Sequence, residues 1–251
     1  MTDPYVPPEG PAPPGGSAGA LATSPWGRPL GVLVSPQPTF RSLAERPSWL
    51  PPLVILLLLV VAGQLLAVPK IDMEAAVREA LERQNQPVND EQVEQMAAMQ
   101  SKFAVACSIP LFAVGLVVAA LLVWGLANAA GGEIGFVRSF AVTLHGLMPN
   151  AVASLLSIPV ILGLQEIDPG EAQRGLLASH LAAFAPEDTS AWLLALLARI
   201  DVFAIWSLVL LVIGLRTVGR LSTAAATGVV LVVWLLWVGF NVGTAAMGWA
   251  G

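Results

Sequence analysis

The chain has 251 residues, of which 56% are hydrophobic and only 12% are charged, against about 25% charged residues in an ordinary soluble domain. Its mean hydropathy of +0.74 argues against a soluble protein, and its net charge of −5 argues against a nucleic-acid partner, because phosphate binding needs a clustered basic face. One cysteine and two histidines exclude an internal disulfide and a thiolate or histidine metal cage, so we expect neither a metal nor a cofactor.

Residues 1–27 are rich in proline and glycine. The first 25 residues contain no basic side chain and no apolar run, both of which a secretory signal needs. A segment this poor in apolar side chains cannot offset its chain entropy by burial. We therefore predict a disordered cytoplasmic tail over residues 1–27.

Residues 28–48 are predicted to form an amphipathic arm on the inner face of a membrane. Phe40 and Leu43 lie three residues apart, and Arg41 and Arg46 flank them. A short helix here would bury the two apolar side chains in the headgroup layer while the arginines meet anionic lipid. The alternative is an entry turn whose apolar side chains pack against the protein.

Five apolar runs follow, and each is a candidate for a spanning helix, which needs about 20 mostly apolar residues. We predict an all-α membrane domain over residues 49–251, a bundle of five transmembrane helices. Its expected spans are 49–68, 104–129, 137–164, 192–215 and 224–247. The fourth run contains Arg199 and Asp201, and the uncharged part after them forms only about 21 Å of helix against a hydrocarbon core of about 30 Å.

The connection after the first span predicts a helical hairpin over residues 70–103 on the outer surface. Met73, Val77 and Leu81 recur every four residues, which is typical of a narrow apolar helix stripe. Asp90 follows as a candidate N-cap of a second helix that runs into the second span. The hairpin either binds a partner or packs as a lid on its own bundle.

Arginine and lysine residues in the connections favour a cytoplasmic N-terminus and an external C-terminus. That orientation brings four polar side chains from three spans to one depth of the bilayer, where each is costly alone: Gln64, Arg199, Asp201 and Asn241. We hypothesise that Asp201 turns inward and bonds Asn241 or Gln64, while Arg199 reaches outward to lipid phosphate. The alternative is that the fourth span begins later and both charges lie in the interface.

The third span contains a polar pair, His145 and Asn150, beside Pro149, where a kink is expected. In a transporter this broken helix would form a binding site. In the alternative, His145 bonds a neighbouring carbonyl of a kinked helix. Neither histidine has a nucleophile within hydrogen-bond reach along its helix or an H-E-x-x-H register, so we predict no catalytic residue.

The fifth span carries Gly239 and Gly243 four residues apart, a small-residue pair at the spacing of close helix contacts. The pair predicts a helix-packing surface. Its partner is either another span of the same chain or a second subunit.

Several stretches together resemble a known family in their order and spacing. The segment SPQPTFRSLAERPSWLPPL over residues 35–53 is similar to the opening of bacterial members of the YIP family, five-span proteins named for the Ypt/Rab-interacting proteins of eukaryotes. Further matching stretches are PKIDMEAAVREALE (69–82), NDEQVEQ before the second span, LHGLMPNAVASLLSIP (144–159), RIDVFAIWSLVLLVIGL (199–215) and RTVGRLSTAAA (216–226). The resemblance covers roughly residues 29–240.

This resemblance implies an all-helical, five-span protein with a cytoplasmic N-terminus, in a bacterial cytoplasmic membrane. Eukaryotic relatives are linked to Rab GTPases, vesicle trafficking and membrane shaping. We therefore expect a non-enzymatic membrane protein whose partners are the lipid bilayer and other membrane proteins or a second copy of itself. The alternative function is a small transporter or permease subunit, with a polar path lined by His145, Asn150 and Asp201.

Overall fold

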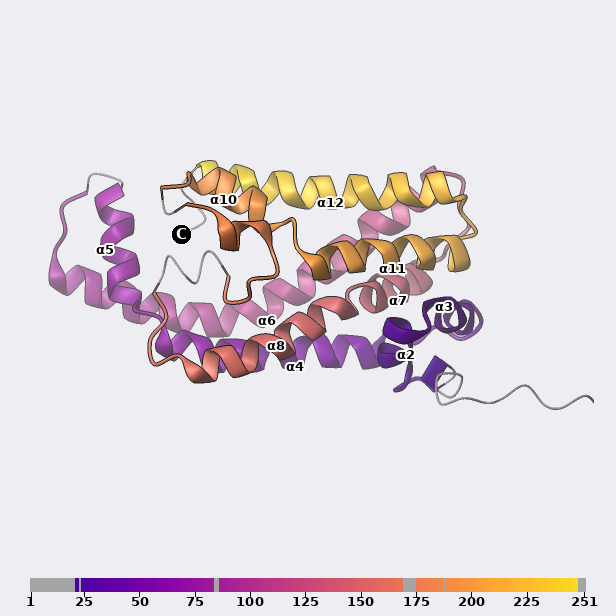
Figure 1. The fold of residues 1–251 in the computed structure, drawn as a ribbon, viewed down its shortest axis with the longest axis horizontal. Coiled ribbons are helices and arrows are strands. Elements are labelled where there is room, and N and C mark those ends of the chain that lie inside the picture. The colour runs from indigo at the N-terminus through magenta and orange to yellow at the C-terminus, as the bar shows by residue number, and fades with distance from the viewer. Residues whose placement is uncertain (1–20, 23, 84–85, 169–174, 187, 248–251) are drawn as a thin grey trace, which may run out of the picture.

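The computed structural model describes residues 21–22, 24–83, 86–168, 175–186 and 188–247. Apart from two isolated β-bridges, the regular structure in these ranges is helical, and the long helices run side by side along the length of the molecule (Figure 1). In chain order the elements are α2 (Arg28–Val34), α3 (Pro36–Glu45), α4 (Leu50–Ala67), η1 (Val68–Lys70), α5 (Met73–Arg83), α6 (Asp90–Ala129), α7 (Phe136–Gly146), α8 (Met148–Gly163), η2 (Leu181–Phe184), α10 (Ala191–Ala198), α11 (Val202–Val218) and α12 (Thr223–Ala246).

The helices confirm the predicted class of an all-α polytopic membrane protein. Four described segments are long and apolar enough to cross a membrane, and they lie close to four of the predicted spans: Leu50–Lys70, Ala106–Ala129, Phe136–Gly163 and Thr223–Ala246. Val202–Val218 is a shorter apolar helix of 17 residues, about 25 Å long. Residues 1–20 of the predicted tail lie outside the described ranges.

The fourth apolar run is not one helix, so the predicted span 192–215 is wrong as a single element. Asp201 Oδ1 accepts hydrogen bonds from the backbone N–H groups of Phe203 (2.7 Å) and Ala204 (3.0 Å), and this N-cap starts α11 after α10 has ended. The intervening backbone pairs with the preceding connection, because Leu181 N–H donates to the Ile200 carbonyl at 3.2 Å. Helix α10 packs against α12 instead of continuing into α11.

The third span is broken at Leu147, eleven residues after its start at Phe136. Helix α7 ends at Gly146, Leu147 has non-helical torsion angles, and α8 starts at Met148 with Pro149 in its first turn. Proline is tolerated there because the first N–H groups of a helix have no partner within it. The break therefore lies two residues before Pro149, between His145 and Pro149, where the sequence predicts a kink.

The predicted helical hairpin is formed by α5 and the first part of α6. Val77 and Leu81 pack against Val93 and Ala97 in a small core of their own. The N-cap of α6 is Asn89, whose side chain accepts a hydrogen bond from Glu91 N–H at 3.0 Å, one residue before the predicted Asp90. Helix α6 has 40 residues in all and continues from the hairpin into the second span, and α5 lies beyond the end of the bundle in Figure 1.

The main core lies at the opposite end of the molecule, where α3, α7, α8 and α11 meet. Its buried side chains come from these four helices and also from α2, α4, α6 and α12. The arm of residues 28–48 is therefore an integral part of the bundle at this end. This is the end at which α4 starts and α11 stops (Figure 1).

Candidate functional site

The arm docks into the bundle through the two residues that were expected to enter the headgroup layer. Phe40 and Leu43 are 0% and 1% exposed, so the prediction that they insert into lipid is wrong, and the entry-turn alternative describes them correctly. The reason is Gly214 on α11. A Cβ at that position would lie 2.7 Å from Val142 Cγ1 and 2.9 Å from Phe40 Cε1, so only the missing side chain lets the ring rest on the helix backbone.

Arg28 holds the arm together from inside. Its Nη1 donates to the Arg46 carbonyl at 2.7 Å and to Ser48 Oγ at 2.8 Å, and its Nη2 donates to Ser42 Oγ at 2.7 Å. Burial, followed by the nearby charge of Arg46, lowers the pKa of the Arg28 guanidinium from its usual value. One cation thus joins the start of α2 to the end of α3 and to the residues just before α4.

The same guanidinium extends the arm toward the N-terminus. Arg28 Nε donates to the Ala22 carbonyl at 3.4 Å, and Gly27 and Arg28 N–H groups bond the Ser24 carbonyl in a helical turn. Ala22 is buried. The described residues of the range 21–27, which were assigned to the disordered tail, therefore belong to the arm.

Arginines and aromatic rings gather at the arm's end of the bundle. Trp49 and Phe140 have ring centroids 5.9 Å apart, Phe140 stacks on Phe136 at 6.0 Å, and Trp124 meets Phe136 edge-on at 6.4 Å. Exposed arginines surround this cluster at 41, 46, 138, 216 and 220. Sequence reasoning missed both Arg28 and the ring cluster, since neither has a local spacing signal that links α2, α4, α6 and α7.

The predicted intramembrane polar cluster does not form. Asp201 caps α11 and accepts a hydrogen bond from Ser179 Oγ, while Asn241 Nδ2 donates to the Trp237 carbonyl of its own helix at 2.8 Å. The structure gives Gln64 no hydrogen bond to either of them. The hypothesised bond from Asp201 to Asn241 or Gln64 is therefore wrong. Arg199 lies in the bend before α11, and its Nε has no hydrogen-bond partner among the described residues.

The polar pair of the third span is divided between two environments. His145 is fully buried, and its Nδ1 lies 2.8 Å from the Ala141 carbonyl one turn earlier, as the kinked-helix alternative proposes. Asn150 is exposed, and Pro149 between them is buried. The structure does not bring the two polar side chains to one site.

The small-residue pair of the fifth span makes no close contact within the described chain. A Cβ at Gly239 or at Gly243 would meet nothing within 4 Å. A packing surface inside the described chain is therefore not found at this pair. A packing role toward a second subunit stays a prediction.

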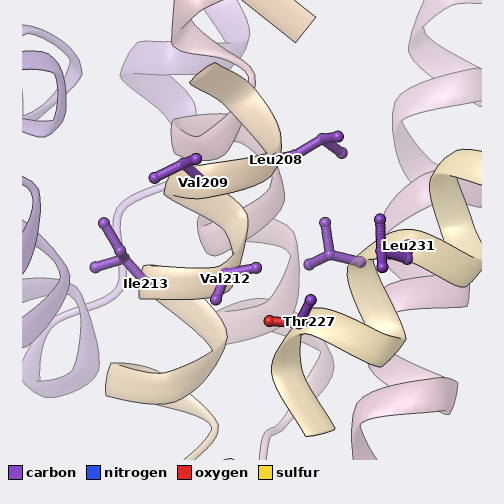
Figure 2. Close-up of a pocket in the computed structure, with 7 residues that line it drawn as sticks. Leu208, Val209, Val212, Ile213, Thr227 and Leu231 are labelled. Atoms are coloured by element: carbon purple, nitrogen blue, oxygen red, sulfur yellow. The ribbon is translucent and has the colours of Figure 1, made fainter. Parts of the chain in front are cut away.

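A groove of about 300 Å3 lies between α11 and α12 in the membrane-spanning part (Figure 2). Leu208, Val209, Val212 and Ile213 line it from α11, with Thr227, Val230 and Leu231 from α12. The Thr227 hydroxyl is the polar side-chain group among these lining residues. Within the described ranges, no group of three or more histidine, cysteine or acidic side chains is placed to hold a metal ion.

Comparison with known proteins identifies the family. The Yip1 domain matches residues 30–244 of the chain. "Membrane protein YknW" of Bacillus subtilis (strain 168) is 25% identical over 196 residues, which cover 78% of this chain and 80% of that protein. No solved structure matches the chain. The family match spans most of the chain and confirms the resemblance inferred from residues 35–53 onward, and the protein therefore belongs to the Yip1 domain family of membrane proteins.

Proposed function

We propose that the protein is a non-enzymatic membrane adaptor that binds another membrane protein through its outer hairpin. The observation that carries this proposal is the position of the hairpin. Helix α5 packs against the outer part of α6 and shares its own small core with it, while the hairpin extends beyond the bundle in Figure 1. A lid would pack on the bundle, so the partner-binding alternative is favoured.

The hairpin surface has the properties of a binding face. Met99 and Phe103 lie one helical turn apart on α6 and are 55% and 60% exposed. Glu74, Glu91 and Glu94 are exposed on the two hairpin helices, and Lys102 is exposed next to Phe103. An apolar pair on a hairpin with more exposed carboxylates than cations suits a partner whose own surface combines an apolar patch with basic side chains.

The proposed location is a bacterial cytoplasmic membrane, with the N-terminus inside and the C-terminus outside. Support comes from the exposed arginines that gather at the end of the bundle where α4 begins, because cytoplasmic connections carry an excess of basic residues. The Bacillus relative is likewise called a membrane protein. In this orientation the hairpin faces outward.

The transporter alternative has less support. It requires a polar path, and the residues expected to line it are a buried His145, an exposed Asn150 and a helix-capping Asp201. The groove between α11 and α12 is lined almost entirely by aliphatic side chains.

The test is site-specific photocrosslinking of the full-length protein in its native membrane. A photoreactive phenylalanine analogue at Phe103 is expected to form an adduct with one protein, whereas the same analogue at the exposed span residue Leu58 should label lipid. Val93→Asp, which disrupts the hairpin core, should abolish the Phe103 adduct without changing the yield of inserted protein. Equal protein adducts from both positions, or a Phe103 adduct that survives Val93→Asp, would refute the proposal.

A further inference from the structure

We propose that the outward face of α2 lies in the headgroup layer where α4 enters the membrane, and that it binds anionic phospholipid there together with Arg41 and Arg46. The proposal rests on the membrane embedding of the protein but not on the partner of the outer hairpin. It replaces Phe40 and Leu43, which are buried, by a different set of lipid-contacting residues.

The outward face is an uncovered apolar stripe. Trp26, Leu30 and Val34 follow one another at four-residue spacing and are 61%, 58% and 68% exposed. Trp26 lies in the helical turn that leads into α2, and four residues advance about 40° around a helix, so the three side chains share one side. In a small helix this is a large area of apolar surface to leave in water.

The opposite face of α2 is fixed to the protein. Arg28 lies about 160° from Leu30 around the helix and is buried, while Gly31 and Val32 are also buried. A Cβ at Gly31 would lie 2.9 Å from Thr39 Oγ1, so α2 and α3 are in close contact there. The stripe therefore cannot turn inward without breaking the hydrogen bonds of Arg28.

The depth of α2 follows from those hydrogen bonds. Arg28 binds the Arg46 carbonyl and the Ser48 hydroxyl, which immediately precede Trp49 and the start of the first span at Leu50. Trp49 is 39% exposed, and tryptophan is enriched at the level of the headgroups. The stripe is thus held at the membrane–water boundary, where an apolar side chain gains by entering the acyl region.

The exposed arginines at this end of the bundle favour an anionic membrane over a second protein as the partner of this surface. Arg41 on α3 and Arg46 directly after α3 are exposed, with Glu45 as the acidic neighbour. Arg138, Arg216 and Arg220 are exposed at the same end of the bundle, with Glu133. Arginine binds lipid phosphate bidentately, and an apolar stripe flanked by arginines is typical of interfacial helices.

The experiment places an environment-sensitive fluorophore on the full-length protein in lipid nanodiscs. The protein carries Cys107→Ser, which removes the single native thiol, and Leu30→Cys for labelling. Two controls carry the label at other exposed positions, Gln92→Cys in the hairpin leg of α6 and Leu58→Cys in the middle of the first span. Quenching is measured with nitroxides on the lipid headgroup or deep on the acyl chain, attached to phosphatidylglycerol or to phosphatidylcholine.

At Leu30 we expect a blue-shifted emission and stronger quenching by the headgroup nitroxide, whereas Leu58 should respond more to the deep nitroxide and Gln92 weakly to both. Labelled phosphatidylglycerol should quench Leu30 more than labelled phosphatidylcholine does, and Arg41→Gln with Arg46→Gln should remove this excess.

Quenching as weak as at Gln92 would overturn the proposal, whether the emission is unshifted (water) or blue-shifted (a protein partner or second copy). Equal quenching by the two lipids would overturn its anionic part. The hairpin variant Val93→Asp should leave the readouts at Leu30 and Leu58 unchanged, which separates this proposal from the hairpin's function.

Discussion

Replacing Gly214 by alanine tests the docking of the arm with a single methyl group. The new Cβ would lie 2.7 Å from Val142 Cγ1 and 2.9 Å from Phe40 Cε1, closer than carbon atoms approach one another. Both neighbours are fully buried, so neither can move aside into solvent. The ring of Phe40 must shift, and with it the packing of α3 against α11.

Two effects of opposite sign set the magnitude. Overpacking a well-filled core costs about 1–3 kcal/mol, while exchanging glycine for alanine inside a helix gains about 0.5–1 kcal/mol. We therefore expect a net loss of about 1 kcal/mol for Gly214→Ala, equivalent to a melting temperature lower by about 2–4 °C for a chain of this size. Gly228→Ala on α12 is the matched control, because open space surrounds its Cβ position, and it should lose no stability.

The assay is thermal unfolding in mild detergent, followed by tryptophan fluorescence. The specific contact is tested by combining Gly214→Ala with Phe40→Leu, which removes the ring atoms that the methyl group meets. The double variant should lose less stability than the sum of the two single variants, because residues in contact are coupled. If Gly214→Ala is as stable as Gly228→Ala, or if the losses simply add, the arm is not packed on α11 in this way.

Three further predictions follow from other contacts. Asp201→Ala should destabilise the protein by about 1 kcal/mol through loss of the α11 N-cap, whereas Asn241→Ala, which loses a bond only to its own helix, should change the melting temperature little. Val93→Asp places a charge in the hairpin core and should expose the hairpin to limited proteolysis. Arg78→Ala removes an ion pair at the surface, so it should lower the free energy of unfolding by less than about 1 kcal/mol and leave the cleavage pattern unchanged. Burial lowers the pKa of His180 from its usual 6.5, so protonation favours the unfolded state and the stability of the protein should fall as the pH drops below about 6.5. His180→Asn should therefore reduce the difference in melting temperature between pH 8 and pH 5. An unchanged difference would contradict this assignment.

Local periodicity was sufficient for much of the fold. Apolar length predicts five spans, and four of them are long apolar helices in the described residues. The stripe of Met73, Val77 and Leu81 predicts a hairpin that the structure contains. The start of α11 has a local sequence signal, because Asp201 directly precedes an apolar run and can serve as an N-cap. The prediction of one span over residues 192–215 instead follows from the length that a membrane-spanning helix requires.

The docking of the arm could not be predicted in the same way. The spacing of Phe40 and Leu43 is the same whether lipid or protein lies opposite, and the choice depends on Gly214, which is far away in the sequence. The hydrogen bonds of Arg28 to Ser42, Arg46 and Ser48 likewise join residues that are 14 to 20 positions apart, and no local spacing pattern predicts them. Amphipathic spacing therefore identified a buried face but not its partner.

Helix α6 runs without a break from the hairpin through the second span. Its 40 residues form a rod of about 60 Å, of which the hairpin leg outside the span, residues 90–105, contributes about 24 Å. A tilt of about 10° at the membrane surface would move the tip of this leg by about 4 Å. At the other end, Asn128 Nδ2 donates to the Ile134 carbonyl at 3.0 Å, which ties the rod to the turn before α7. The hairpin and the turn before α7 thus lie at the two ends of one helix, whose hydrogen-bond ladder lacks one donor at Pro110.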